Sequence, residues 1–359
     1  MTPTASGADL ALAELTTIGV GGPARRLEEA VTEAEIIDAV RAADDAEEPL
    51  LIIGGGSNLL ISDAGFDGTV LRIRTSGIRT NSEDTCGGAS VLVQAGQNWD
   101  EFVHDAVLHA RSGVEALSGI PGATGATPVQ NVGAYGSEVA HTIAAVRVWD
   151  RQEQQVRTFT TSELQFGYRD SVLKRHRWQG ITGSPRYVVL TVEFQLPLSR
   201  MSAPIRYAEL AARLDVPLGE RASALDVREA VLELRGRKGM VLDAEDRDAF
   251  STGSFFTNPV ISEEQAAGLP DEAPRYPASG GVKLSAAWLI AASGFSRGFG
   301  SELTGGRASL STKHTLAITN RGGADATDIL AVARAVRQGV QDRFGIELEA
   351  ESLLVGLQL

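Results

Sequence analysis

The sequence predicts an α+β fold, in which short strands and helices follow one another without a regular repeat. An apolar strand pattern, LLIIGGG at 50–56, follows an amphipathic helix pattern at 32–44. Further strand patterns at 69–74 and 90–96 precede a helical pattern at 99–107. This strand–turn–strand–helix succession favours an α+β arrangement over a regular βα repeat.

Capping and turn residues mark the boundaries of the expected elements. Thr32 followed by Glu35 is a capping-box pattern, which begins the first helix. Gly294 and Gly345 are placed to end two later helices. After residue 140 we expect strands at 146–149 and 187–196, helices at 226–235, 283–292 and 325–344, and a C-terminal strand at 346–357.

Length and composition limit the classes of protein. The 359 residues are enough for two or three domains of roughly 100–200 residues each. The net charge of −13 disfavours nucleic acid as a partner. A single cysteine, Cys86, allows no internal disulfide and no cysteine-based metal site. Because the N-terminus has no secretory-signal pattern and no run of about 18 apolar residues occurs, we expect a cytoplasmic enzyme without membrane segments.

Two glycine-rich segments are candidate ligand-binding loops. IIGGGSNLL at 52–60 places three glycines directly after a strand, where backbone amides and Ser57 suit a pyrophosphate. The pattern is not G-x-G-x-x-G, and a plain glycine-rich turn explains it equally well. The segment 119–136, GIPGATGATPVQNVGAYG, is unusually long for an irregular loop, which favours a function. Its backbone donors and acceptors suit a flat heterocycle.

Three further stretches carry reactive or charged side chains. Arg169 in GYRDSVLK offers a planar guanidinium that can bind a carboxylate, and a surface ion pair with Asp170 is the simpler alternative. Ser254 in STGSFFTNP has no G-x-S-x-G pattern around it, so proton donation suits it better than nucleophilic attack. No group of residues has the spacing of metal ligands. One face of the expected C-terminal strand carries three carboxylates, Glu347, Glu349 and Glu351.

Taken together, the motifs resemble those of the UDP-N-acetylenolpyruvoylglucosamine reductases, the flavoenzymes that complete UDP-N-acetylmuramic acid for bacterial peptidoglycan. The resemblance covers the chain from about Leu15 to its C-terminus. It implies an FAD-binding fold of the PCMH/vanillyl-alcohol-oxidase type, with two subdomains followed by a C-terminal α+β substrate domain. The motifs are, in order, IIGGGSNLL, GIPGATGATPVQNVGAYG, FGYRDSVLK, GSFFTNPV, KLSAAWLI and a terminal L-x-x-E.

The resemblance also implies which residues bind the cofactor and the substrate. Tyr207, Lys238 and Asn258 match substrate-binding residues, and Tyr207 indicates the longer type of the family, in which a tyrosine closes over the uridine diphosphate. NADPH is the expected reductant of the flavin. The residues expected to line a noncovalent FAD are Gly54, Gly55, Gly56, Ser57, Asn58, Ile120, Pro121, Gly122, Gly125, Ala126, Gln130 and Asn131.

Three residues match the catalytic group of the family. Hydride from the reduced flavin would reach the methylene carbon of the enolpyruvyl group, and negative charge would develop on the substrate carboxylate. Arg169 and Glu351 match the residues beside that carboxylate, and Ser254 matches the serine that protonates the adjacent carbon. We expect Asp170 to orient Arg169. The family often has proline before its terminal glutamate, where this chain has alanine, so Glu349 is the fallback for Glu351.

The resemblance implies an order of domains, and two other functions stay open. We expect a loose tail at 1–14, a first FAD subdomain at 15–75 with a returning strand at 350–359, a second at 76–240, and a substrate domain at 241–349. One alternative is another FAD oxidoreductase of this fold, many of which attach flavin through a histidine that neither candidate flavin loop contains. The other is a non-catalytic sensor of flavin and nucleotide-sugar, which would need none of the three catalytic residues.

Overall fold

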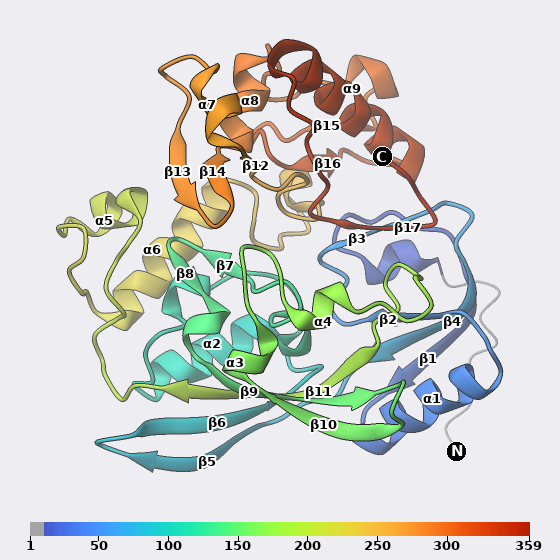
Figure 1. Ribbon diagram of the computed structural model, residues 1–359, viewed down its shortest axis with the longest axis vertical. Helices are drawn as coiled ribbons and strands as arrows, with labels where there is room; N and C mark the ends of the chain where they lie inside the picture. Colours follow the sequence, from blue (N-terminus) through green and yellow to red (C-terminus); the bar gives the residue numbers. More distant parts are fainter. Residues whose placement is uncertain (1–10) are drawn as a thin grey trace. The chain divides into compact units, whose positions relative to one another are not determined.

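The computed structural model describes residues 11–359, and these residues form two compact units (Figure 1). The first unit contains residues 24–56 and 66–237. The second contains residues 11–23, 57–65 and 238–359. Each unit therefore combines segments that lie far apart in the sequence, and the glycine-rich turn at 54–58 passes from the first unit to the second.

A small parallel sheet begins the first unit. Its order is β1-β4-β2, formed by β1 (Ala24–Ala30), β4 (Phe66–Ile73) and β2 (Leu50–Ile53). Helix α1 (Glu33–Asp45) lies between β1 and β2 in the chain. The expected capping box is present, because the Thr32 hydroxyl accepts from the Glu35 amide and the Glu35 carboxylate accepts from the Thr32 amide. The helix predicted from the sequence is thereby confirmed.

An antiparallel sheet with the order β10-β9-β11-β6-β5 dominates the first unit (Figure 1). Its central strand β11 is apolar along most of its length and confirms the strand expected at 187–196. The strands are β5 (Ile78–Asp84), β6 (Gly88–Gln94), β9 (Ile143–Asp150), β10 (Gln155–Thr160) and β11 (Tyr187–Leu196).

Helices and a short hairpin complete the first unit. An aromatic cluster of Trp99, Phe102 and Phe194 packs α2 against β11, with ring centroids of the two phenylalanines 4.7 Å apart. Burying such side chains is the main favourable term that holds the helix on the sheet. The helices are α2 (Trp99–Leu108), α3 (Thr161–Leu164), α4 (Val172–Arg175), α5 (Ala208–Leu214) and α6 (Ala224–Arg237), and the hairpin is β7 (Gly133–Ala134) with β8 (Ser137–Glu138).

The second unit is built from small sheets and three helices within residues 11–359. Strand β17 (Leu353–Val355) pairs in parallel with β3 (Leu59–Ile61), so the end of the chain returns to a segment near its beginning. The remaining elements are β12 (Val260–Ile261), β13 (Arg275–Ala278) and β14 (Gly281–Leu284) in one sheet, β15 (Ala308–Leu310) with β16 (Ile318–Asn320), and the helices α7 (Glu263–Ala267), α8 (Ala286–Ala292) and α9 (Ala326–Phe344).

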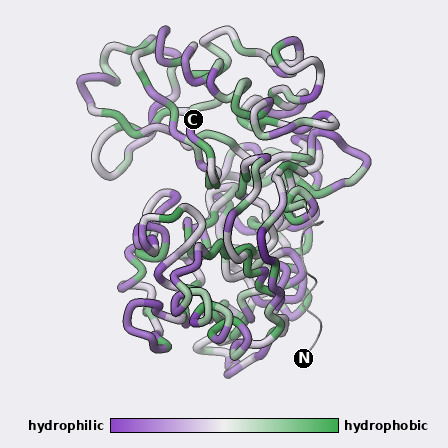
Figure 2. Tube along the Cα trace, turned by 90° about the vertical axis from the view of Figure 1, so that its right-hand side faces the viewer, coloured by the Kyte–Doolittle hydropathy of each residue, from purple (hydrophilic) through white to green (hydrophobic). Residues whose placement is uncertain are grey.

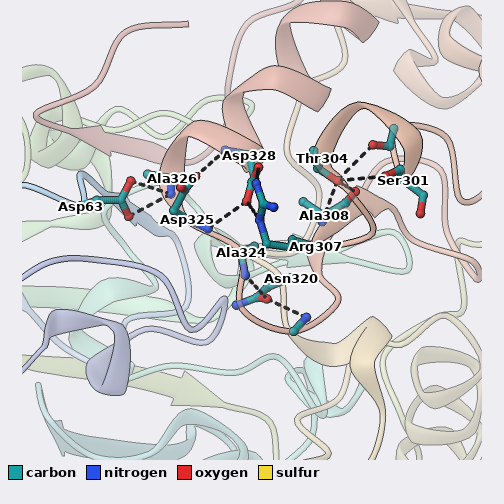
Figure 3. Close-up of polar contacts among 12 residues, drawn as sticks. Asp63, Ser301, Thr304, Arg307, Ala308, Asn320, Ala324, Asp325, Ala326 and Asp328 are labelled. Atoms are coloured by element: carbon teal, nitrogen blue, oxygen red, sulfur yellow. Dashed lines mark hydrogen bonds and ion pairs between the residues drawn. The ribbon is translucent and has the colours of Figure 1, made fainter.

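The N-terminus of α9 joins distant segments of the second unit (Figure 3). Both carboxylate oxygens of Asp63 accept from the Ala326 amide, at 3.0 and 2.9 Å. Asp325 caps the same helix, and the Arg307 guanidinium donates to both oxygens of Asp328 at 2.7 Å. The contacts of Asp63 and Asp325 satisfy amide groups that have no partner inside the helix.

Parts of the second unit differ from the elements that the sequence predicts. The helix expected at 283–292 begins only at Ala286, because Lys283 and Leu284 pair with β12 and β13. The expected C-terminal strand is regular only over β17, and 346–352 is not a regular strand. Part of the expected tail, 1–10, lies outside the described residues, whereas Leu12 is buried and begins a short 3-10 helix.

The described residues contain no helix long and apolar enough to cross a membrane. Figure 2 agrees with this, since hydrophobic and hydrophilic residues alternate over short distances along the trace.

Candidate functional site

The two candidate flavin loops touch in the first unit. A methyl group placed on Gly55 would lie 2.5 Å from the Cα of Gly122, and one on Gly54 would lie 3.0 Å from the Cβ of Ala123. Only glycine at position 55 therefore allows this close approach of two backbones. The structure brings together the 54–56 turn and the start of the 119–136 loop, which the sequence separates by more than 60 residues.

The 119–136 loop is held by backbone hydrogen bonds to the start of α2 and the residues before it. The Thr124 amide donates to the Gln97 carbonyl at 2.8 Å, and the Trp99 amide donates to the Gly122 carbonyl at 3.0 Å. Gly125 packs against Ala95, where a methyl group on the glycine would lie 2.6 Å from the alanine Cβ. The loop is thus fixed in position, and it contains a short 3-10 helix at Thr124–Ala126 and the strand β7.

Asn131 connects this loop to the turn that carries Arg169. The Asn131 side chain is buried, and its Nδ2 donates to the Glu138 carboxylate at 2.8 Å and to the Gly167 carbonyl at 3.0 Å. Its Oδ1 accepts from the Ala140 amide at 3.2 Å. These bonds give the predicted cofactor residue Asn131 a structural role. Gln130, its neighbour, is half-buried.

Arg169 lies at the tip of a tight turn in a strained conformation. Gly167 and Asp170 pair across the turn, and Arg169 has a φ of +52°, in the left-handed region that costs energy for a residue with a side chain. Its Nη2 donates to the Gly133 carbonyl at 3.0 Å. The Asp170 carboxylate pairs with Arg175, so the contact that the structure records for Asp170 differs from the expected orientation of Arg169.

In the second unit, the segment that carries Ser254 runs beside the segment that carries Glu351. The Glu351 amide donates to the Phe255 carbonyl at 2.8 Å, and the Thr257 amide donates to the Glu349 carbonyl at 3.0 Å. Phe256 and Ala350 form a bridge between the two segments. Ser254 and Glu351 are therefore near neighbours although they are almost 100 positions apart in the sequence.

The three carboxylates near the C-terminus differ in environment. Glu347 and Glu349 are exposed, and Glu347 pairs with Arg337. Glu351 is half-buried, and the Asn58 Nδ2 donates to its carbonyl at 3.2 Å. This difference favours Glu351 over the fallback Glu349 as a residue of an enclosed site. The three residues do not share one face of a regular strand, because the only strand in this segment is β17, which begins after them.

The predicted substrate residues lie in different surroundings. Asn258 accepts through Oδ1 from the Ala286 amide at 2.9 Å, at the start of α8. Lys238 directly follows α6, and Tyr207 directly precedes α5 with 43% of its surface exposed. The Tyr207 ring meets the Tyr135 ring edge-on, with centroids 5.4 Å apart.

Tyr135 is half-buried and Arg235 is buried, and each influences the charge state of the other, although neither was expected from the sequence to belong to the site. Burial raises the pKa of the Tyr135 phenol to about 12, and the nearby Arg235 opposes this rise. Burial lowers the pKa of the Arg235 guanidinium to about 10, against the fields of Tyr135 and Asp100. Arg235 lies in the helix pattern expected at 226–235, on the same side as its apolar residues. An arginine on the buried side of a helix was the feature of the sequence that could have marked it as a functional residue.

Comparisons with known proteins show the family to which the chain belongs. A family model described as the C-terminal domain of UDP-N-acetylenolpyruvoylglucosamine reductase matches residues 245–355, and a model of an FAD binding domain matches residues 25–158. The UDP-N-acetylenolpyruvoylglucosamine reductase of Cutibacterium acnes is 51% identical over 351 residues, covering 98% of this chain and 90% of that protein. The chain belongs to the UDP-N-acetylenolpyruvoylglucosamine reductase family. The reductase of Mycobacterium avium is 50% identical, with 97% and 95% of the two chains covered.

A solved member of the reductase family has the same fold. The crystal structure of UDP-N-acetylenolpyruvylglucosamine reductase from Thermus caldophilus matches with a TM-score of 0.61 and 26% identity, over 97% of this chain and 98% of that chain. Together with the FAD binding domain model, this confirms the expected α+β FAD-binding fold with a C-terminal substrate domain.

A surface cavity of the first unit is lined by other residues. It has a volume of about 500 Å³ and lies on one face of the antiparallel sheet, lined by residues such as Arg79, Gln94, Arg147 and Thr191. None of the expected site residues lines it. Among residues 11–359, no group of three or more His, Cys, Asp or Glu side chains is placed to hold a metal ion.

Proposed function

We propose that this chain reduces UDP-N-acetylglucosamine enolpyruvate to UDP-N-acetylmuramate, with FAD as cofactor and NADPH as reductant, in peptidoglycan precursor synthesis. The observation that carries the proposal is the pairing of the Ser254 segment with the Glu351 segment. Reduction of a carbon–carbon double bond needs both a hydride and a proton, and paired segments that carry a hydroxyl donor and a carboxylate suit the transfer of that proton. An oxidase of alcohols or a sensor needs neither residue.

The first unit fits a noncovalently bound FAD. The close packing of Gly55 on Gly122 leaves backbone amides of two loops side by side and free of side chains, which suits a pyrophosphate. Neither loop contains a histidine that could attach the flavin. We therefore expect a yellow protein whose flavin enters the supernatant after acid precipitation. Flavin that stays with the precipitated protein would contradict the noncovalent assignment.

Arg169 is proposed to hold the carboxylate of the substrate. When bound, FAD supplies hydride transfer from NADPH to the substrate carbon. As the hydride arrives, negative charge grows on the substrate carboxylate, and a fixed cation stabilises that charge more in the transition state than before it. The Gly133 carbonyl and the tight turn restrict the Arg169 guanidinium in advance. Glu351 is proposed to act at the same carboxylate.

Ser254 is proposed to donate the proton to the carbon next to the one that receives hydride. A serine hydroxyl is a weak acid in water, so it needs a position fixed in apolar surroundings. Phe255 and Phe256, which follow it, are buried in the core of the second unit with exposed fractions of 0% and 2%. These rings anchor the backbone that carries Ser254.

Tyr207, Lys238 and Asn258 are proposed to bind the nucleotide part of the substrate. A chain with a net charge of −13 needs local positive charge to bind a diphosphate, and Lys238 supplies it. The exposed Tyr207 ring, supported edge-on by Tyr135, suits a side chain that closes over the ligand.

A two-step absorbance experiment tests the function. The yellow protein is mixed with NADPH without oxygen, and the flavin band should bleach. Addition of UDP-N-acetylglucosamine enolpyruvate should restore the colour and yield UDP-N-acetylmuramate. Recovery with oxygen alone and not with the enolpyruvyl substrate would indicate an oxidase. A protein that binds the substrate but neither bleaches nor turns over would be a sensor.

A further inference from the structure

Asp100 joins two elements of the first unit that carry different parts of the proposed site. It lies in the first turn of α2, where its Oδ1 accepts from the amide of Gly119, the first residue of the 119–136 loop, at 2.6 Å. Arg228 of α6 donates through Nη1 and Nη2 to the two carboxylate oxygens at 2.6 and 2.7 Å. The paired geometry is the directional, charge-assisted form of an arginine–carboxylate contact.

Residues at the start of α2 hold the candidate flavin loop at 119–136 in place. The Trp99 indole Nε1 donates to the Leu117 carbonyl at 3.0 Å, and the Trp99 amide donates to the Gly122 carbonyl at 3.0 Å. The Trp99 side chain is fully buried. Asp100 adds a charged contact with α6, so the 119–136 loop and α6 both bind to the first turn of α2.

Tyr135, on the proposed substrate side, packs against the apolar cluster that contains Val231 and Leu234 of α6. Arg235 of α6 is 7% exposed and lies in the electrostatic field of Tyr135, whose ring supports Tyr207. The Asp100 carboxylate also favours the charged form of Arg235, against the effect of burial on its pKa. Asp100 therefore acts on α6 at two of its arginines.

We propose that Asp100 and Arg228 are positioning residues for substrate binding. The pair fixes α6, with Arg235 and the tyrosines beside it, relative to the flavin loop. This inference rests on the proposed function, because it assigns the Tyr135–Tyr207 side to the nucleotide-sugar. It adds that the position of α6 relative to the 119–136 loop depends on a side-chain pair that contacts neither FAD nor the nucleotide-sugar.

The decisive variant is Asp100→Asn, which keeps an oxygen for the Gly119 amide but removes the charge that Arg228 needs. Isothermal titration of the oxidised holoprotein with the enolpyruvyl substrate measures the dissociation constant. We expect this constant to rise about 10-fold, since contacting residues commonly couple by that amount. The rate of bleaching by NADPH should stay within about 2-fold, because that step does not use the substrate side.

Two further variants and a control sharpen the test. Arg228→Lys keeps the charge but loses the two-pronged geometry, so a smaller rise is expected. The double variant Asp100→Asn with Arg228→Gln should bind no more weakly than Asp100→Asn alone, because no guanidinium is left without its carboxylate. Glu33→Gln is the matched control: Glu33 also lies in the first turn of a helix, has a similarly exposed side chain and pairs with Arg147. It should change neither quantity.

The outcomes separate the inference from the function. Unchanged substrate affinity in Asp100→Asn and Arg228→Lys would overturn the positioning role. A parallel fall of substrate affinity, bleaching rate and FAD content would also overturn it, because the pair would then only stabilise the fold. If Asp100→Asn does not fold, Arg228→Lys is judged by the same criteria. A wild-type protein that fails to bind the enolpyruvyl substrate would refute the proposed function, and the inference with it.

Discussion

Replacement of Gly55 by alanine tests the loop contact on which the proposed FAD site depends. The added methyl group would lie 2.5 Å from the Cα and 2.9 Å from the carbonyl carbon of Gly122. Carbon atoms in contact ordinarily lie about 3.5–4.0 Å apart, so the two loops must separate by about 1 Å. Because the obstructing atoms belong to backbone, no rotation of a side chain can relieve the clash. Overpacking of this kind costs about 1–3 kcal/mol.

The cost should appear mainly when FAD binds. The apoprotein can let the 54–56 turn move away from the 119–136 loop, whereas the bound cofactor requires both loops in place. The FAD dissociation constant of Gly55→Ala should therefore rise by roughly 5- to 150-fold, which is the same 1–3 kcal/mol expressed as affinity. Recovery of flavin fluorescence on dilution measures this constant. Thermal unfolding of the apo and holo forms shows whether the variant loses stability in both forms or only with FAD bound.

A control glycine makes the result specific. Gly236 is exposed on α6, and a methyl group there would meet nothing within 4 Å. Gly236→Ala should leave FAD affinity unchanged and stabilise the helix by up to about 1 kcal/mol. If Gly55→Ala binds FAD as tightly as the wild type, the loop contact does not form part of the cofactor site, and the reasoning from backbone packing is refuted.

Three further predictions follow from the site and from the second unit. Ser254→Ala should retain FAD and bleach with NADPH near the wild-type rate, while reoxidation by the enolpyruvyl substrate slows about 10²-fold or more in rapid-mixing absorbance; equal slowing of both steps would make Ser254 structural. Tyr207→Phe should raise the substrate KM, with a loss of roughly 1.5–3 kcal/mol for one hydrogen bond to a charged group, and an unchanged KM would mark Tyr207 as a packed aromatic. The hydrogen bonds from Arg307 lower the pKa of the Asp328 carboxyl below its usual value of 3.8. The ionised carboxylate therefore stabilises the fold at pH values above 3.8, and this stabilisation is lost as the pH falls through the lowered pKa. The difference in Tm between wild type and Asp328→Asn should therefore be largest near neutral pH and shrink in acid; a constant difference would mean that the charge contributes nothing.

Local signals predicted the parts of the fold that depend on near neighbours. The Thr32–Glu35 capping box and α9, between the Asp325 cap and Gly345, are confirmed close to their expected bounds. Such signals work because a cap bonds to amides within the next turn and a glycine supplies a backbone conformation at its own position. The strand β11 was also predicted from the sequence, because a strand that is buried on both faces consists almost entirely of apolar residues.

Local signals failed where two segments compete for the same residues. The helical pattern around 283–292 is real from Ala286 onward, but Lys283 and Leu284 gain strand partners from β12 and β13. The C-terminal pattern alternates well from 346 onward, yet only β17 finds a continuous partner in β3. Partners at such distances along the chain are not visible in the propensities of either segment.

The sequence indicated which residues make up the proposed site, whereas their arrangement depends on contacts that form only in the folded chain. The motifs around Gly55, Asn131, Arg169 and Ser254 indicated a flavin-dependent reductase, and the family relationship bears this out. Only the folded chain sets Gly55 against Gly122 and brings the Ser254 segment beside Glu351. Motifs record which residues a site needs at short spacing, whereas contacts between distant segments depend on the summed burial and hydrogen bonding of each unit.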